Sequence, residues 1–61
     1  MNMDRRNRLQ KVIDDLAAII DEEQEAFDNI PESIQGSERG LTAEQNLDDM
    51  NDAKGTLENI L

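Results

Sequence analysis

The residues of this chain that could perform chemistry are almost all carboxylates. Its 61 residues include 15 Asp and Glu but no His and no Cys. The sequence therefore lacks the usual general base at neutral pH and the commonest zinc ligands. A calcium loop of the EF-hand type needs acids or amides at positions one, three and five before its glycine. Counting back from Gly55 puts Met50 first, counting back from Gly40 puts Gln35 first, and neither stretch fits.

Other arrangements of the carboxylates fail in the same way. Asp48, Asp49 and Asp52 could attract cations loosely, but a solvated acidic helix face explains them better. A di-iron bundle needs Glu-x-x-His pairs, and the chain has no His. The sequence also contains no defensible nucleophile–base pair, glycine-rich phosphate loop or paired-carboxylate motif. We therefore predict a protein that is not an enzyme and that needs no metal and no cofactor.

One segment has a composition that a helix does not explain. Residues 29–40 read Asn-Ile-Pro-Glu-Ser-Ile-Gln-Gly-Ser-Glu-Arg-Gly and contain the only Arg outside the N-terminal region. The segment is longer than a helix hairpin needs, and functional loops on rigid scaffolds often have such compositions. One interpretation is a capped turn in which Ile34 packs and Arg39 pairs with a nearby acid. The other is a site that binds a partner or ligand, with these candidate residues: Gln35, Ser37, Glu38 and Arg39.

Two series of regularly spaced apolar residues, which we call ladders, flank this segment and would form the helices that position it. Each advances by alternating steps of four and three residues, which places its side chains along one face of an α-helix. Each ladder has one charged rung, Glu23 in the first and Lys54 in the second. The first comprises Leu9, Ile13, Leu16, Ile20, Phe27 and Ile30, and the second comprises Ala43, Leu47, Met50, Leu57 and Leu61.

The ladders predict an all-α fold, an antiparallel helical hairpin forming a single domain over residues 1–61. The expected elements are a helix over about 4–29, a connection with a short helical turn over about 30–41, and a helix over about 42–61.

Single residues set the expected ends of these helices. Pro31 ends the first helix. Ile34 is expected to be buried as a lid over the end of the hairpin. Ser37 could cap the second helix, but the capping box from Thr42 to Gln45 favours a start at Thr42, since Gly40 inside a helix costs about 1 kcal/mol.

A two-helix hairpin has one apolar side and nothing of its own to cover it. Chains of this size rarely gain more than about 3–5 kcal/mol from their own core. We therefore predict assembly into a helical bundle by homo-oligomerisation, as a homodimer or a larger assembly. The predicted oligomer seam consists of Leu9, Ile13, Leu16, Ile20, Phe27, Ile30, Leu47, Met50, Leu57 and Leu61.

The formal net charge of −9 limits the possible partners. It argues against direct nucleic-acid binding and against an anionic membrane surface. No apolar run spans a bilayer, and the N-terminal region lacks the apolar core of a signal peptide, so we expect a cytoplasmic protein of a bacterial host. The bases cluster near the start, and in a hairpin they would face the last carbonyls of the second helix: Arg5, Arg6, Arg8 and Lys11.

Residues 22–40, Glu-Glu-Gln-Glu-Ala-Phe-Asp-Asn-Ile-Pro-Glu-Ser-Ile-Gln-Gly-Ser-Glu-Arg-Gly, resemble the signature of a known family. Its members are small acidic helical-hairpin proteins of Gram-positive bacteria, especially gut Firmicutes, and of their phages. The resemblance covers about a third of the chain. The second helix departs from the family pattern at Asn46, Asn51, Lys54 and Gly55. The resemblance implies a phage or mobile-element origin and assigns no functional residue.

Three functions are consistent with these features. The first is a phage-type interaction protein that binds and inhibits a host factor, with a possible counter-defence role, by analogy only. The second is a homo-oligomeric sponge that sequesters a small nucleotide-like signal through residues 30–40, where Arg39 and free N–H groups could hold a phosphate. The third is an inhibitor that mimics DNA with its carboxylates. The expected partners are the chain itself and either a host protein or a small ligand.

Overall fold

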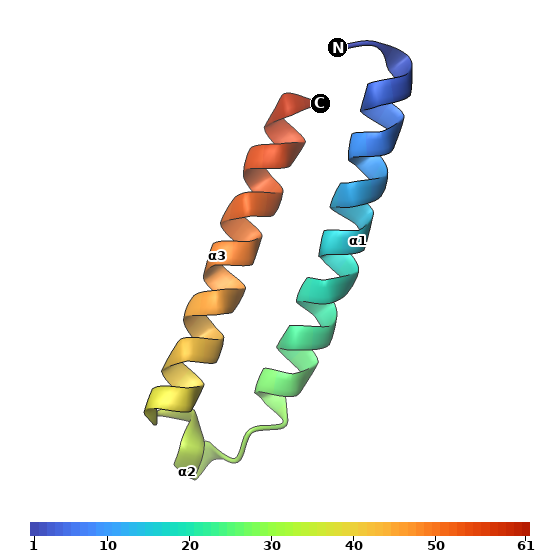
Figure 1. The fold of residues 1–61 in the computed structure, drawn as a ribbon. Coiled ribbons are helices and arrows are strands. Elements are labelled where there is room, and N and C mark those ends of the chain that lie inside the picture. Colours follow the sequence, from blue (N-terminus) through green and yellow to red (C-terminus); the bar gives the residue numbers. More distant parts are fainter.

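The computed structural model describes all 61 residues as a helical hairpin. Its elements are α1 (Met3–Asp28), the single turn α2 (Glu32–Gln35) and α3 (Glu38–Ile60). α1 and α3 lie side by side and antiparallel, with both termini at one end and α2 at the other (Figure 1). The Cα atoms span 49 × 15 × 10 Å, so the molecule is a thin rod. The predicted all-α hairpin with a short helical turn in its connection is confirmed.

α1 begins and ends close to where the sequence predicts. The Asn2 side chain caps its first turn by accepting a hydrogen bond from the Arg5 N–H at 2.8 Å. At the other end the Asn29 N–H donates to the carbonyl of Glu25, and Pro31 follows two residues later. Proline has no N–H to donate and restricts the residue before it, so the helix cannot continue through this point.

α3 begins four residues before the predicted start at Thr42. Ser37 occupies the N-cap position and Glu38 is the first helical residue, so Thr42 lies inside the helix and caps nothing. Gly40 explains the difference. It is buried, and a Cβ atom there would lie 2.0 Å from the carbonyl oxygen of Gln35. The absence of a side chain lets the first turn of α3 pack against α2, and this close contact offsets the cost of about 1 kcal/mol for a helical glycine.

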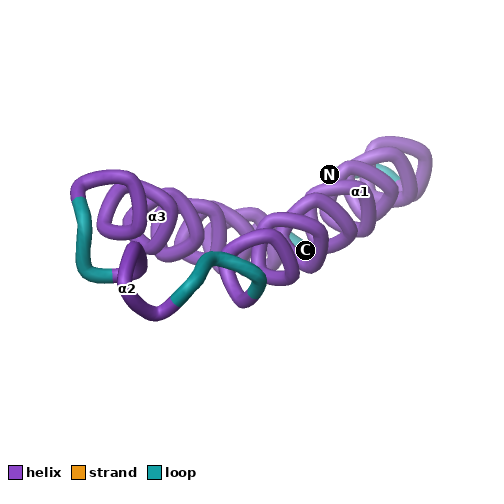
Figure 2. The backbone as a smooth tube through the Cα atoms, turned by 90° about the horizontal axis from the view of Figure 1, so that it is seen from below, coloured by secondary structure: helices purple, strands orange, loops and turns teal.

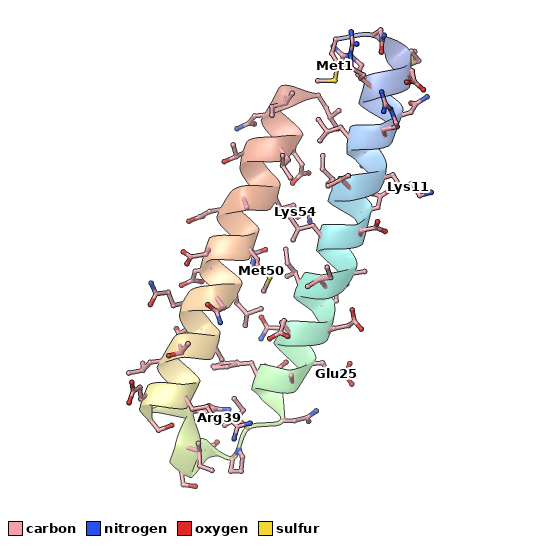
Figure 3. All side chains as sticks on the ribbon, viewed as in Figure 1. Met1, Lys11, Glu25, Arg39, Met50 and Lys54 are labelled. Atoms are coloured by element: carbon pink, nitrogen blue, oxygen red, sulfur yellow. The ribbon has the colours of Figure 1, made fainter.

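The core of the single hairpin is narrow. Only three apolar side chains are buried, Ile13, Ile20 and Leu47, with exposed fractions of 3, 8 and 5%. Leu61 is exposed, as is the acidic rung Glu23. Lys54 is half-buried and extends toward α1 (Figure 3). The other ladder residues are only half-buried: Leu9, Leu16, Phe27, Ile30, Ala43, Met50 and Leu57.

The expectation that Ile34 is a buried lid is wrong. Its exposed fraction is 38%, and α2 contains no buried residue. Seen along the hairpin from the loop end, α2 lies to one side of α3 and does not cover the seam (Figure 2). The physical reason is the backbone contact between Gln35 and Gly40, which holds the short turn against α3 by main chain rather than by Ile34.

Of the four N-terminal bases predicted to face the end of the second helix, Arg6 alone forms a hydrogen bond there. The Arg6 guanidinium donates hydrogen bonds to the main-chain oxygens of Leu61 and Met1. Arg8 pairs with Asp4 one turn away at 3.1 Å. A cation beside the last carbonyls of α3 is favourable because these groups carry the negative end of the helix dipole. Neither long helix is apolar enough to cross a bilayer.

Candidate functional site

Two of the four candidate binding residues in the connection are engaged in holding it together. The Gln35 side-chain amide donates a hydrogen bond to the carbonyl of Ile30 at 3.0 Å. The Ser37 hydroxyl donates to the carbonyl of Ile34 and makes no capping bond with α3. The first bond satisfies a carbonyl between α1 and α2, and the second is made to a carbonyl of α2 that also accepts the Ser37 N–H. A ligand that used Gln35 and Ser37 would have to break both bonds.

The other two candidates, Glu38 and Arg39, are exposed. Arg39 lies at the loop end near the last turn of α1 (Figure 3). It makes no ion pair, and the one ion pair of the molecule joins Arg8 and Asp4. The expected pairing of Arg39 with a nearby acid is therefore wrong in this structure. An exposed Arg with no internal partner is available to an external carboxylate or phosphate.

The hairpin has no pocket and no group of three or more residues arranged to hold a metal ion. A function must therefore be sought on the outer surfaces of the rod. Two of these surfaces differ strongly in chemistry, one apolar and one acidic.

The apolar surface follows from a second seven-residue stripe on each helix. On α1, Val12 and Ile19 each come one residue before a buried isoleucine. On α3, Ala53 and Ile60 each come one residue before a rung of the ladder. Both helices are right-handed and run antiparallel, so residues that precede seam positions lie on the same side of the hairpin. The two stripes therefore border one continuous surface.

The burial of the seam residues supports this placement. Val12, Ile19 and Ile60 have exposed fractions of 53, 48 and 49%. The seam residues between them are half-buried, and the helical period turns them toward the same side. Met50 is an example that can be followed between the two helices in Figure 3. We call this surface the open face and define it by eight residues: Leu9, Val12, Leu16, Ile19, Met50, Ala53, Leu57 and Ile60.

The sequence prediction included half of the open face and missed the other half. Leu9, Leu16, Met50 and Leu57 belong to the predicted oligomer seam. Val12, Ile19, Ala53 and Ile60 were not predicted as site residues. The signal that could have found them is the spacing of seven between Val12 and Ile19 and between Ala53 and Ile60, which widens each ladder into the three-in-seven apolar face typical of bundle helices.

The acidic surface covers the sides of the rod that point away from the seam. Glu25 and the base Lys11 extend from α1 away from α3 (Figure 3). Most of the bases are gathered near the chain termini, so the rest of the outer surface is strongly negative. The exposed acids on it include Asp14, Asp15, Asp21, Glu22, Glu25, Asp48, Asp49 and Asp52.

Comparisons with protein-family models, with curated proteins and with solved structures found no match to this chain. The resemblance of residues 22–40 to small acidic phage and Firmicutes proteins therefore stays a prediction.

Proposed function

We propose that this protein is a non-enzymatic interaction protein: a hairpin that self-associates through its open face and binds a basic protein of its host through its acidic outer surface. The resemblance of residues 22–40 to phage proteins favours inhibition of a host factor as the outcome of binding. Arg39, the one cation of the loop end, contacts an acidic group of the bound partner and helps to fix its orientation.

The observation that carries the proposal is the open face. Monomeric soluble proteins rarely expose a large contiguous apolar patch, and such patches mark interaction sites. Here the eight apolar residues of the open face line both helices, whereas only three apolar side chains are buried inside the hairpin. More apolar residues line the open face than are buried within the single chain, so association is at the centre of the proposed function.

The acidic surface supports a basic protein as the second partner. With 15 acids against six bases, the field around the outer sides of the rod attracts Lys-rich and Arg-rich surfaces and repels nucleic acid. Electrostatic complementarity of this kind speeds association and selects partners. The sponge for a nucleotide-like signal has less support, because two of its candidate ligand residues, Gln35 and Ser37, are engaged in internal hydrogen bonds.

The test is capture of partners by the tagged protein in a lysate of a Gram-positive host. We expect a basic protein to be retained at low salt. We also expect its retention to fall when Asp21 and Glu25 are both replaced by Lys. These residues lie away from the open face, so the double variant keeps its own assembly. If the double variant retains the basic protein as well as the wild type does, the proposal is contradicted.

The two alternative functions give other results. Release of a small nucleotide from the purified protein would favour the sponge, and displacement of a DNA-binding protein from DNA would favour the DNA mimic.

A further inference from the structure

We propose that the open face is covered by a second copy of this chain, stacked end for end, so that Arg5 of each copy meets Glu23 of the other. This inference rests on the self-association in the proposed function and adds the face, the orientation and the charge pair that sets it. In this dimer α1 packs on α1 and α3 packs on α3, each pair antiparallel.

The positions of Arg5 and Glu23 on α1 are the first step. Arg5 comes seven residues before Val12, and Glu23 comes seven residues after Leu16, so both lie on the stripes that form the open face. Both are exposed, and neither side chain forms a hydrogen bond or ion pair within the chain. The apolar part of the face on α1 is thus bounded by a free cation at one end and a free anion at the other.

The register of the apolar residues is the second step. On α1 they extend from Leu9 to Ile19, and on α3 from Met50 to Ile60. A two-fold axis across the middle of these stretches lays Leu9 opposite Ile19 and Met50 opposite Ile60 of the second copy. The same operation brings Arg5 opposite Glu23. The alignment that best overlaps the apolar residues is therefore also the one that pairs the charges.

The alternative is a dimer with its two-fold axis along the helices. That arrangement stacks the basic ends together and the acidic ends together. It also sets α1 against α3 of the second copy, where Glu23 faces the region of Asn46 and has no cation beside it. A carboxylate at the edge of an apolar interface with no partner is costly. Charge complementarity therefore favours the end-for-end arrangement.

The area available is sufficient for a stable dimer. In this register α1 overlaps its copy over residues 3–25, a rise of about 35 Å, and two helices side by side are about 20 Å wide. Contact along this overlap covers roughly 700 Å² on each copy, close to the roughly 800 Å² per partner that is typical of a specific protein–protein interface. The connection and Arg39 lie beyond this overlap, so each end of the dimer presents one loop to other partners.

The test uses charge reversal at the proposed pair. Arg5→Glu places two carboxylates at each contact, and Glu23→Arg places two guanidinium groups there. We expect each single variant to raise the dimer dissociation constant about tenfold, because two symmetry-related attractions become repulsions. The combined Arg5→Glu/Glu23→Arg variant restores the pairing with the charges exchanged, and we expect it to dimerise within about threefold of the wild type. Sedimentation equilibrium at low salt measures all three constants.

Two variants of α1 provide matched controls. Lys11→Glu and Glu25→Arg make the same charge changes on side chains that point away from α3 (Figure 3), and we expect them to leave the dissociation constant unchanged. Glu23→Arg is the most informative variant. It lowers the net negative charge of the chain, so it would strengthen a non-specific association, whereas the proposed charge pair predicts a weaker dimer. For Arg5→Glu, weaker dimerisation would not come from a weaker fold, since an acid in the first turn of a helix is favourable.

The results for the single and combined variants test the orientation of the dimer independently of whether the chain self-associates. Weakening by both single variants with recovery in the combined variant supports the end-for-end dimer. Recovery cannot arise within one chain, because the two residues lie 18 positions apart on one helix, about 27 Å. A dimer that neither single variant weakens, or that the combined variant fails to restore, overturns the orientation and leaves self-association standing. A wild-type chain that stays monomeric at millimolar concentration overturns both.

Discussion

Gly40 shows how a single residue decides where an element begins. By helix propensity it is a poor residue for the first turns of α3, and the sequence rules moved the predicted start past it to Thr42. In the structure it is buried against the main chain of Gln35, where no other residue fits. A rule that counts propensity along one helix cannot detect this, since the contact depends on how the connection folds back.

The first prediction concerns this contact. Gly40→Ala should lower the free energy of unfolding by roughly 1–3 kcal/mol, because the added methyl group meets a carbonyl oxygen that cannot move freely. Thermal unfolding followed by circular dichroism measures the change. The matched control is Gly55→Ala, where the added Cβ meets no side chain and no atom of another element within 4 Å. That variant should be more stable by up to about 1 kcal/mol. Equal effects of the two substitutions would contradict the role of Gly40.

The second prediction concerns Arg39. The sequence suggested two roles for it, pinning the turn or contacting a partner, and the structure contains no internal partner for it. Arg39→Ala should therefore change the free energy of unfolding by less than about 0.5 kcal/mol. It should weaken the capture of a host partner more strongly. Melting and capture are measured on the same variant, and unchanged capture would remove the loop end from the proposed function.

At the scale of the elements, two neighbouring residues of α1 have different roles. Ile20 is buried in the hairpin seam, and Ile19 lies on the open face with about half of its surface exposed. The period of the helix turns one toward α3 and the other away from it. In the proposed dimer, folding of the hairpin and assembly therefore depend on different residues.

The third prediction uses this pair. Ile20→Asp should unfold the protein, because it buries a charge with no partner at a cost of several kcal/mol, comparable with the whole stability of a domain this small. Ile19→Asp should keep the hairpin helical but dissociate the assembly. Circular dichroism and sedimentation of both variants test this. If Ile20→Asp melts like the wild type, the assignment of the seam is wrong.

The same scale shows what the sequence could predict. The four-three spacing of apolar residues identified both long helices and their mutual face, because that spacing is a property of each helix alone. Pro31 located the end of α1 to within one residue. The exposure of Ile34 and the internal bonds of Gln35 and Ser37 could not be predicted, since they depend on the path of the connection. The outer half of the open face was predictable from its spacing of seven but was missed.

For the whole molecule, folding and assembly are expected to be linked. The hairpin buries few side chains. In the proposed dimer the open face becomes covered only when a second copy binds. Anything that binds only the folded state stabilises it by an amount that grows with the logarithm of its concentration, and so raises the melting temperature. The fourth prediction is therefore that the melting temperature of the wild-type protein rises with protein concentration, as measured by calorimetry over a hundredfold range. For Ile19→Asp the melting temperature should be independent of concentration.

The central claim is that the single hairpin is not the functional unit. Sedimentation equilibrium of the wild-type protein from micromolar to millimolar concentration tests this most directly. We predict a folded, helical species of twice the 6.9 kDa chain mass that dissociates on dilution. A folded species that keeps the mass of one chain at every concentration would contradict the account.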